Sequence, residues 1–428
     1  MRKILFILVG IIFATNAFAA SLINDTETER LLGEIVQPLA ATANIPNNRL
    51  KIHIVKDDSF NAFVMGGEDV YIYTGLLTRI KNPNALQAVV AHELGHTIGG
   101  HMAQMSERMS AEMKRTMLIQ ALGVGLMVAG GNPTLGAGVL AGSGGIAQQS
   151  MMAFTRDEER MADNLGVELM IDAKQDPNGF ITVFEQMHEI TGALEEKINP
   201  NHVNHPLTTE RLNNVRTQIK QHQPQYKTDK ILEDKYELVR AKLIGYLDKP
   251  ARIRELYPYS DKSSPAIYAR AIANMQGGNL DGAKIGVGTL ISREPDNPYF
   301  YELLGDIEYQ FGHYDDSISA YETALKLTQN APQIQTALAL VLTERRKHND
   351  DVRAIELCKR AILTEATPMA YWVLARAYGD KDIGRSSWAM AEYYAQIKKP
   401  EEAKKHAKQA QKHLKNNDPE YIKAGDLL

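Results

Sequence analysis

The apolar positions in the N-terminal part of the chain predict helices combined with a few short strands. Residues 21–45 predict a helix that leads into a turn at residues 45–48. Residues 51–55 alternate between apolar and polar types, which predicts a strand, and residues 70–73 predict a second strand between glycine-containing turns. These segments predict a small β-sheet among helices.

Residues 86–91 are apolar and helical in character, and they lead directly into His92-Glu93-Leu94-Gly95-His96. Residues four apart lie on one face of a helix, so His92 and His96 can direct both imidazoles at one metal ion. Glu93 can then reach a water molecule at that ion, as in the HExxH motif of metalloproteases. The alternative is a surface helix with two chance histidines. The apolar neighbours instead predict a buried helix, where unpaired polar side chains are costly.

A catalytic zinc ion needs a third protein ligand and an open position for water. The segment 155–166 predicts a second helix with Glu159 and Asp163 on one face. We expect Glu159 to be the third metal ligand beside His92 and His96. Asp163 is expected to orient a ligating histidine by accepting a hydrogen bond from its outer nitrogen. Taken alone, this segment indicates an ordinary charged, solvated helix, and the HExxH motif makes that the weaker interpretation.

These motifs resemble those of the gluzincin metallopeptidases related to HtpX and the CAAX prenyl proteases. The similarity extends to Asn61-Ala62-Phe63 before the predicted zinc helix and to His205-Pro206 after it. Two positions depart from the family pattern, Thr155 where Ser is usual and Met161 where Glu is frequent, and neither is a predicted ligand. The resemblance implies a zinc metalloendopeptidase with one Zn²⁺ per chain and Glu93 as general base.

Within this family the chain is most similar to periplasmic members that carry a repeat domain, in which a histidine blocks the zinc ion. The resemblance implies that His205 occupies the fourth zinc position until its loop moves, whereas without it a surface histidine is an equal alternative. It also implies action on misfolded or stalled outer-membrane proteins, with the barrel-assembly machinery as partner of the repeat domain. Arg211 is expected near the site without an assigned role. Ordinary surface or core positions are expected for His53, His101, His188 and His202.

Two segments near the predicted site allow more than one interpretation. The predicted strands offer either an edge that pairs with an extended substrate or a purely structural hairpin. Residues 116–147 form two apolar arms around Gly130-Gly131-Asn132-Pro133, and each arm is shorter than the roughly 18 residues of a membrane-spanning helix. A mobile lid is the favoured interpretation, ahead of a buried hairpin and of a peripheral membrane contact.

Beyond a predicted linker at residues 221–225 the pattern is helical and repetitive. Ala271 and Ala283 recur 34 residues later as Gly305 and Ser317. A period of 34 residues is that of the tetratricopeptide repeat, in which small residues let paired helices approach closely. We expect about four repeats stacked as a protein-binding solenoid, rather than a non-repeat helical bundle.

The composition and the first residues of the chain indicate the cellular compartment of the protein. The 428 residues carry a net charge of −4, so no nucleic-acid-binding surface is indicated. A positive start, a short apolar core and Ala17-Phe18-Ala19 predict a cleavable secretory signal peptide rather than an anchor helix. Cys358 is the single cysteine, which excludes an intrachain disulfide. These features predict a periplasmic protein.

The chain as a whole predicts a mainly α fold, with an α+β catalytic domain of zincin type followed by an α-solenoid. The expected domains are a signal peptide at 1–19, a zinc metallopeptidase domain at 20–222 and a TPR domain at 223–428. The main functional hypothesis is a periplasmic zinc endopeptidase with chaperone-like activity in outer-membrane protein quality control. The alternative is chiefly a TPR scaffold or chaperone with a latent, self-blocked protease site.

Overall fold

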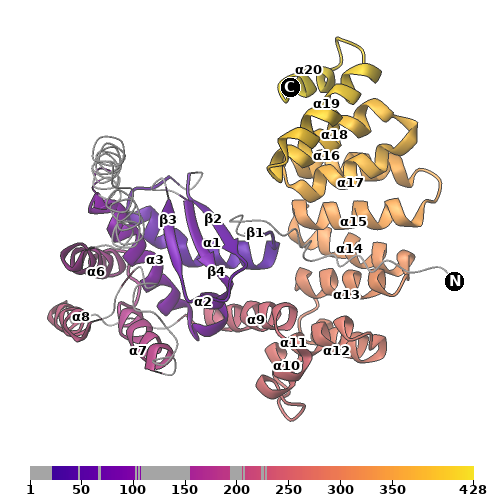
Figure 1. The fold of residues 1–428 in the computed structure, drawn as a ribbon. Coiled ribbons are helices and arrows are strands. Elements are labelled where there is room, and N and C mark those ends of the chain that lie inside the picture. Colours follow the sequence, from indigo (N-terminus) through magenta and orange to yellow (C-terminus); the bar gives the residue numbers. More distant parts are fainter. Residues whose placement is uncertain are drawn as a thin grey trace, which may run out of the picture.

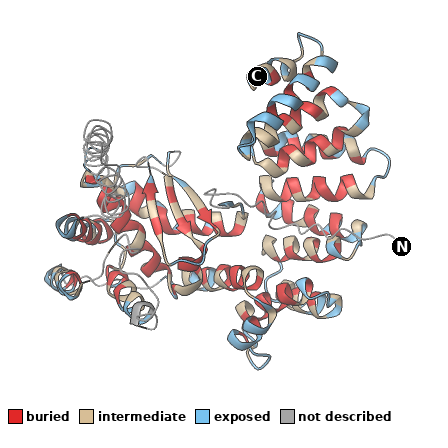
Figure 2. Cartoon of the chain, in the orientation of Figure 1, coloured by how far each residue is buried: buried red, intermediate tan, exposed pale blue. Residues whose placement is uncertain are grey.

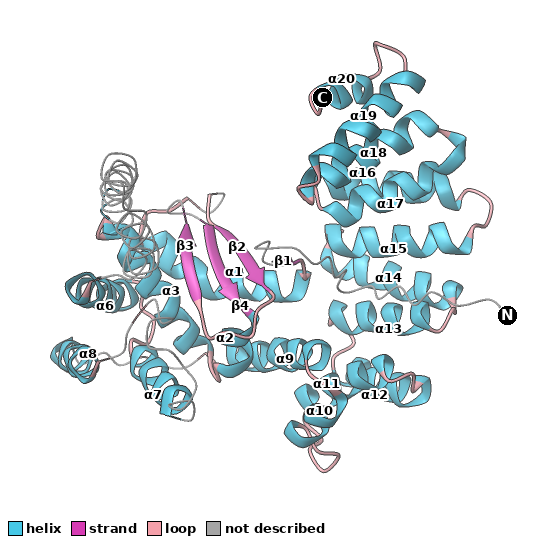
Figure 3. Cartoon of the chain, in the orientation of Figure 1, coloured by secondary structure: helices cyan, strands magenta, loops and turns pink. Residues whose placement is uncertain are grey.

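The computed structural model describes residues 22–46, 49–65, 69–101, 104, 107, 155–192, 205, 208–222, 226 and 229–428. The predicted signal peptide, the segment 116–147 and His202 lie outside these residues. Figure 1 shows two regions, a mixed one that contains a small sheet and a stack of helices that extends to the C-terminus. The strands are confined to the first region (Figure 3), which confirms the mainly α fold class.

The sheet of the first region has four strands in the order β1-β2-β4-β3. Their bounds are β1 Leu22–Ile23, β2 Lys51–Val55, β3 Ala62–Met65 and β4 Asp69–Tyr73. The two predicted strands are confirmed as β2 and β4, which pair in parallel with Ile54 opposite Ile72. The strand β3 pairs antiparallel with β4, with Phe63 opposite Tyr71, and forms an edge of this sheet.

Helices cover this sheet and carry the predicted motifs. Their bounds are α1 Thr26–Thr42, α2 Thr74–Arg79, α3 Pro83–Ile98, α6 Arg156–Asp172, α7 Asn178–Gly192 and α8 Thr209–His222. The predicted helix at 21–45 is shorter than expected, since residues 22–23 pair with β2 and Asp25 caps α1 by accepting from the backbone of Thr28. An asparagine cap at Asn82 and Pro83 in the first turn start α3.

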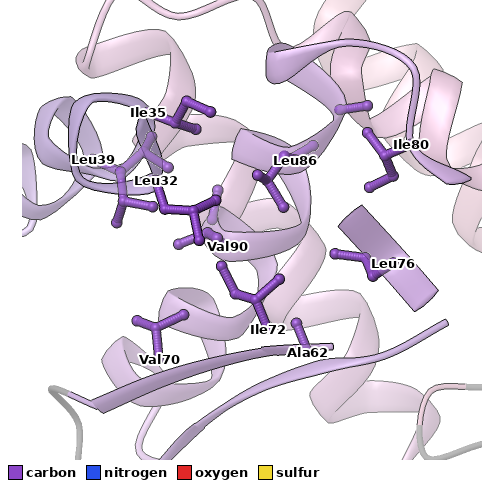
Figure 4. Close-up of a cluster of buried hydrophobic side chains, with 14 of the residues drawn as sticks. Leu32, Ile35, Leu39, Ala62, Val70, Ile72, Leu76, Ile80, Leu86 and Val90 are labelled. Atoms are coloured by element: carbon purple, nitrogen blue, oxygen red, sulfur yellow. The ribbon is translucent and has the colours of Figure 1, made fainter. Parts of the chain in front are cut away.

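The core of this region lies between the sheet and the helices α1 and α3. Figure 4 shows Leu32 and Leu39 from α1 and Val90 from α3 gathered over Ile72 of β4. All four side chains are buried. Burial of each such side chain contributes about 1.5–3 kcal/mol, so this core fixes α3 against the sheet.

The second region is an array of antiparallel helices, with buried side chains on the faces that meet (Figure 2). The bounds are α9 Lys230–Leu247, α10 Pro250–Leu256, α11 Ser264–Gln276, α12 Leu280–Arg293, α13 Pro298–Gln310, α14 Tyr314–Thr328, α15 Pro332–Arg345, α16 Asp350–Thr364, α17 Pro368–Tyr378, the 3₁₀ turn η2 Gly379–Lys381, α18 Ile383–Gln396, α19 Pro400–His413 and α20 Pro419–Gly425. A proline lies in the first turn of α10, α11, α13, α15, α17, α19 and α20, where no backbone donor is needed.

The small residues at the repeat period lie where helices meet. A Cβ at Gly305 of α13 would come within 2.8 Å of the Tyr321 ring of α14, so the helix pair requires glycine there. Ala271 and Ala283, one repeat earlier, are buried between α11 and α12. The 34-residue period therefore arises from the contact points of successive helix pairs.

Helix α9 belongs to both regions. Tyr236, Val239 and Leu243 complete the core around the sheet, while Leu238 packs with α11 and α12. The boundary proposed after residue 222 stays a prediction. None of the described helices combines the length and the apolarity that a membrane crossing requires.

Candidate metal centre

The histidines of the HExxH motif face one another inside the protein. His92 and His96 are both buried on α3, and their Nε2 atoms are 3.2 Å apart. Their rings meet edge to face, with centroids 4.7 Å apart. The four-residue spacing on a helix thus directs two imidazole nitrogens to one point.

Glu159 reaches the same point from α6. Its carboxylate oxygens lie 3.5 Å from Nε2 of His92 and 3.4 Å from Nε2 of His96. The two helices approach closely here. A Cβ at Gly95 would lie only 2.4 Å from the backbone oxygen of Ala162. The glycine inside the motif therefore lets α6 bring its carboxylate to the histidines.

The three groups fit a zinc ion. Imidazole nitrogens about 2.0–2.1 Å from a tetrahedral ion lie roughly 3.3 Å from one another. The separations of 3.2, 3.4 and 3.5 Å among His92, His96 and Glu159 match that geometry. Two imidazoles and one carboxylate are also the ligands that zinc takes in hydrolytic enzymes.

His205 lies against this cluster. Its Nδ1 is 3.3 Å from Nε2 of His92 and 2.8 Å from the Glu159 carboxylate. Its Nε2 is 3.5 Å from the Glu93 carboxylate. The ligand atoms of His92, His96, Glu159 and His205 all lie within 4.8 Å of one another. His205 therefore stands between the three candidate ligands and the candidate base.

Glu93 is buried next to the cluster on α3. The backbone of Val64 on β3 bonds to its carboxylate, which joins the sheet edge to the motif. Burial raises the pKa of Glu93, although the nearby His205 and His92 lower it. A carboxylate with a raised pKa accepts protons more readily near neutral pH, which suits a general base.

Asp163 and Arg211 form the outer layer of the site. The carboxylate of Asp163 is 2.8 Å from Nδ1 of His92. Arg211 donates to it from Nε at 2.7 Å and from Nη2 at 2.8 Å, and its Nη1 lies 2.6 Å from Glu159. Burial alone would raise the pKa of Asp163, but the bonds from Arg211 and His92 hold it below its usual range. Arg211 thus orients the carboxylates of Glu159 and Asp163. The sequence did not predict this role, because Arg211 lies 48 residues after Asp163 in the chain.

His101 contacts the motif histidine His96, although the sequence predicted an ordinary surface or core position for it. Its Nδ1 lies 3.0 Å from Nδ1 of His96, and its Nε2 lies 3.3 Å from the sulfur of Met161. Helix α3 ends at Ile98, and the left-handed Gly100, with φ of 69°, turns the chain back. A Cβ at Gly99 would come within 2.6 Å of the His101 ring. The pair Gly99-Gly100 followed by a histidine was the signal in the sequence.

The other histidines that the structure describes do not join this centre. His53 bonds to Asp69 at 2.9 Å across the β2–β4 pair. His188 is exposed on α7.

The chain is similar to known metallopeptidases and repeat proteins. The model of peptidase family M48 matches residues 26–219, and a TPR repeat model matches residues 305–344. The beta-barrel assembly-enhancing protease of Escherichia coli (strain K12) is 26% identical over 75% of this chain and 66% of that protein. The metalloprotease YcaL of the same organism is 28% identical over 44% of this chain and 68% of that protein.

The solved structure of yeast Tom70 aligns with 79% of this chain and 81% of that chain, with a TM-score of 0.31 and 12% identity. The chain spans about two thirds of the length of the beta-barrel assembly-enhancing proteases that it matches. The M48 match includes His92, His96, Glu159 and Asp163, and the TPR match covers α13 to α15. Residues 26–219 therefore match the model of peptidase family M48, and in this chain they are joined to TPR-type helices.

Proposed function

We propose that this protein is a zinc-dependent endopeptidase in which His92, His96 and Glu159 hold one zinc ion. The observation that carries the proposal is the convergence of these three groups from two helices, with Glu93 beside them. Buried polar groups of this kind are costly unless they are paired or bind an ion.

The reaction would be hydrolysis of a peptide bond. Bound zinc supplies a Lewis acid that polarises the scissile carbonyl and makes water more acidic. Glu93 accepts a proton on its carboxylate from the attacking water and then delivers it to the departing amine. Asp163 accepts a hydrogen bond from the Nδ1–H of His92, so the proton stays on Nδ1 and Nε2 is left unprotonated for the metal. Arg211 keeps Asp163 ionised and correctly oriented.

We further propose that His205 makes the enzyme latent. Its ring touches both a candidate ligand and Glu93, where substrate and water have to be placed. Cleavage then requires the ring to move away. The edge strand β3 supports a second part of the proposal, in which an extended substrate pairs with β3 and meets Glu93 through its neighbour Val64.

For its biological setting, we propose a periplasmic role after removal of residues 1–19. The similar proteins are named beta-barrel assembly-enhancing proteases, which supports substrates among misfolded or stalled outer-membrane proteins. The TPR-type helices are proposed to contact the barrel-assembly machinery and to provide chaperone-like binding, since stacked repeats commonly bind proteins.

The variant Glu93→Gln tests the proposed chemistry. It should retain about one zinc per chain, because Glu93 is no ligand, yet lose at least ~100-fold of casein-degrading activity, the lower end of what a general base supplies. Zinc content by atomic absorption and casein cleavage by gel are the measurements, with Glu189→Gln on α7 as a matched exposed control. Wild-type cleavage rates in Glu93→Gln would contradict the proposal.

The second candidate function is a scaffold or chaperone with a blocked protease site, and the position of His205 favours it. Expression of Glu93→Gln in a strain that lacks the protein separates the two. Full rescue of an outer-membrane defect would favour the scaffold, and loss of rescue would favour proteolysis.

A further inference from the structure

Helix α19 concentrates positive charge near the C-terminal end of the helical array (Figure 1). Residues 398–415 contain seven lysines and two glutamates, a net charge of +5 with neutral histidines, whereas the whole chain has a net charge of −4. All seven lysines are exposed, namely Lys398, Lys399, Lys404, Lys405, Lys408, Lys412 and Lys415. This short segment is therefore opposite in sign to the rest of the chain.

Four of these lysines lie together on the exposed side of α19. The side that packs on the array is formed by small buried residues, Ala403, Ala407 and Ala410. Lys404, Lys408 and Lys412 follow one another at four-residue intervals, so they form a row along the exposed side. We refer to these three residues and Lys405 as the lysine face. They line a surface hollow together with Gln409 and Glu401.

Several cations elsewhere in the array are paired with carboxylates of the preceding helix. Arg345 and Lys347 lie 2.7 Å and 2.8 Å from the carboxylate of Asp315 on α14. In α19, Lys405 lies 3.8 Å from Glu402, one turn earlier on the same helix. Within the part of the chain that the structure describes, the other three residues of the lysine face form no ion pair. The lysine face therefore keeps most of its charge available for a partner.

The composition of the lysine face indicates which kind of partner it fits. Like charges close together repel one another, and an anionic partner would offset this repulsion. Helix α19 has no apolar residue larger than proline, so it offers no anchor for a pocket of a protein partner. A terminal helix that only keeps the array soluble needs a polar face, which charges of both signs also supply. A surface with many phosphate groups requires positive charge alone.

We propose that the lysine face binds the phosphate groups at the surface of a membrane that contains anionic phospholipids. About four to eight basic residues on one helix are typical of such a contact, and each strengthens binding about fivefold. The contact is reversible and sensitive to salt, because nothing in α19 enters the bilayer. It does not depend on the proposed peptidase activity, and it would hold the helical array at a membrane surface.

Sedimentation with lipid vesicles tests this contact. The full-length protein should bind vesicles of phosphatidylglycerol mixed with phosphatidylcholine at least ~100-fold more tightly than vesicles of phosphatidylcholine alone. The triple variant Lys404→Gln/Lys408→Gln/Lys412→Gln should lose about 100-fold of this affinity, because three lysines each contribute about fivefold. Glutamine has nearly the same helix propensity as lysine, and circular dichroism checks that the variant is folded.

The matched control changes the net charge equally at a distance from the lysine face. It replaces three exposed lysines elsewhere in the array by glutamine, namely Lys249, Lys262 and Lys326. This control should bind anionic vesicles as the wild type does. An increase in salt from about 0.1 M to about 1 M shortens the screening length from about 10 Å to about 3 Å, and it should release the wild type.

Equal binding to the two kinds of vesicle would overturn the proposal, as would binding that persists at high salt. Wild-type affinity in the folded triple variant would also overturn it. An equal loss of affinity in the control would indicate a response to net charge alone and would exclude a specific role of the lysine face. Poly-glutamate beads test the other kind of anionic partner. Binding to these beads that the triple variant loses, without binding to anionic vesicles, would assign the lysine face to an acidic polypeptide and exclude the membrane.

Discussion

At the scale of residues, the candidate centre consists of a layer of metal-facing atoms and a layer that orients them. Each histidine of the motif has its outer nitrogen engaged, His92 by Asp163 at 2.8 Å and His96 by His101 at 3.0 Å. If Nε2 of His96 is to bind a metal, its Nδ1 carries the proton and donates a hydrogen bond to Nδ1 of His101. The Nε2–H of His101 then points to the sulfur of Met161. Such outer partners fix the ring orientation of a ligand.

Replacement of His101 by Ala should therefore weaken zinc binding without altering the ligands themselves. We expect the dissociation constant for zinc to rise about 10- to 100-fold, as it does when an outer-layer partner of a ligand is removed. Competition with a chromogenic chelator measures the affinity, and circular dichroism checks the fold. His188→Ala, at an exposed histidine of α7, should leave the affinity unchanged. Equal affinities in the two variants would exclude the orienting role of His101.

At the scale of elements, the close contact of α3 with α6 sets the ligand geometry. The backbones meet at Gly95 and at Gly166, where a Cβ would lie 3.0 Å from the backbone of Ala91. The capping box of Thr155 and Glu158 fixes the start of α6 one turn before Glu159. The carboxylate ligand is thus positioned by a helix start and two glycine contacts.

Gly95→Ala tests this contact. The new Cβ would meet the backbone oxygen of Ala162 at 2.4 Å, so the helices have to separate. We expect a loss of about 1–3 kcal/mol in the free energy of unfolding, the usual cost of overpacking, and weaker zinc binding. Urea denaturation and chelator competition are the measurements. Gly33→Ala on α1, where a Cβ meets nothing within 4 Å, should be neutral or stabilising by about 0.5–1 kcal/mol.

At the scale of the whole molecule, the N-terminal end of α1 joins the sheet-containing region to the helical array. Lys242 of α9 is buried and lies 2.5 Å from Asp25 and 3.2 Å from Glu27, while Tyr268 of α11 donates to Glu27 at 2.8 Å. Farther along the array, Thr26 donates to Gln333 of α15 at 2.8 Å. The two regions are therefore connected by polar contacts, of which the ion pairs of Lys242 with Asp25 and Glu27 depend on ionisation.

Stability should depend on pH through Glu29. Burial and the neighbouring Glu365 raise the pKa of Glu29 to about 8, and Gln333 donates to both carboxylates. A raised pKa means that the folded state holds this proton more tightly than the unfolded state. The corresponding stabilisation is present below the ordinary carboxyl pKa and is lost as pH rises toward 8.

Glu29→Gln should therefore flatten the pH dependence. We expect the wild type to lose at least ~1 kcal/mol relative to this variant between pH 5 and pH 8. Thermal melts across that range measure the difference. Glu34→Gln, at a partly exposed position of the same helix, serves as the control. Parallel melting curves for wild type and Glu29→Gln would contradict a raised pKa at this contact.

The sequence by itself determined the class of the fold and much of the candidate site. Period-two alternation predicted β2, and the bounding glycine-containing turns predicted β4. The 34-residue period predicted the paired helices, and the four-residue spacings put His92 with His96 and Glu159 with Asp163 on common helix faces. These are local properties, because the geometry of a single helix or strand follows from consecutive residues. The edge strand β3 was too short and too close to glycines for its pattern to be recognised.

Only the tertiary structure decided which faces meet. The distance between Glu159 and the motif histidines depends on backbone contacts at Gly95 and Gly166, and neither glycine has a local signal for its partner helix. The roles of Arg211 and His101 arise from side chains brought together by packing across the core. Such contacts depend on the shape of two surfaces at once, which no single stretch of sequence specifies.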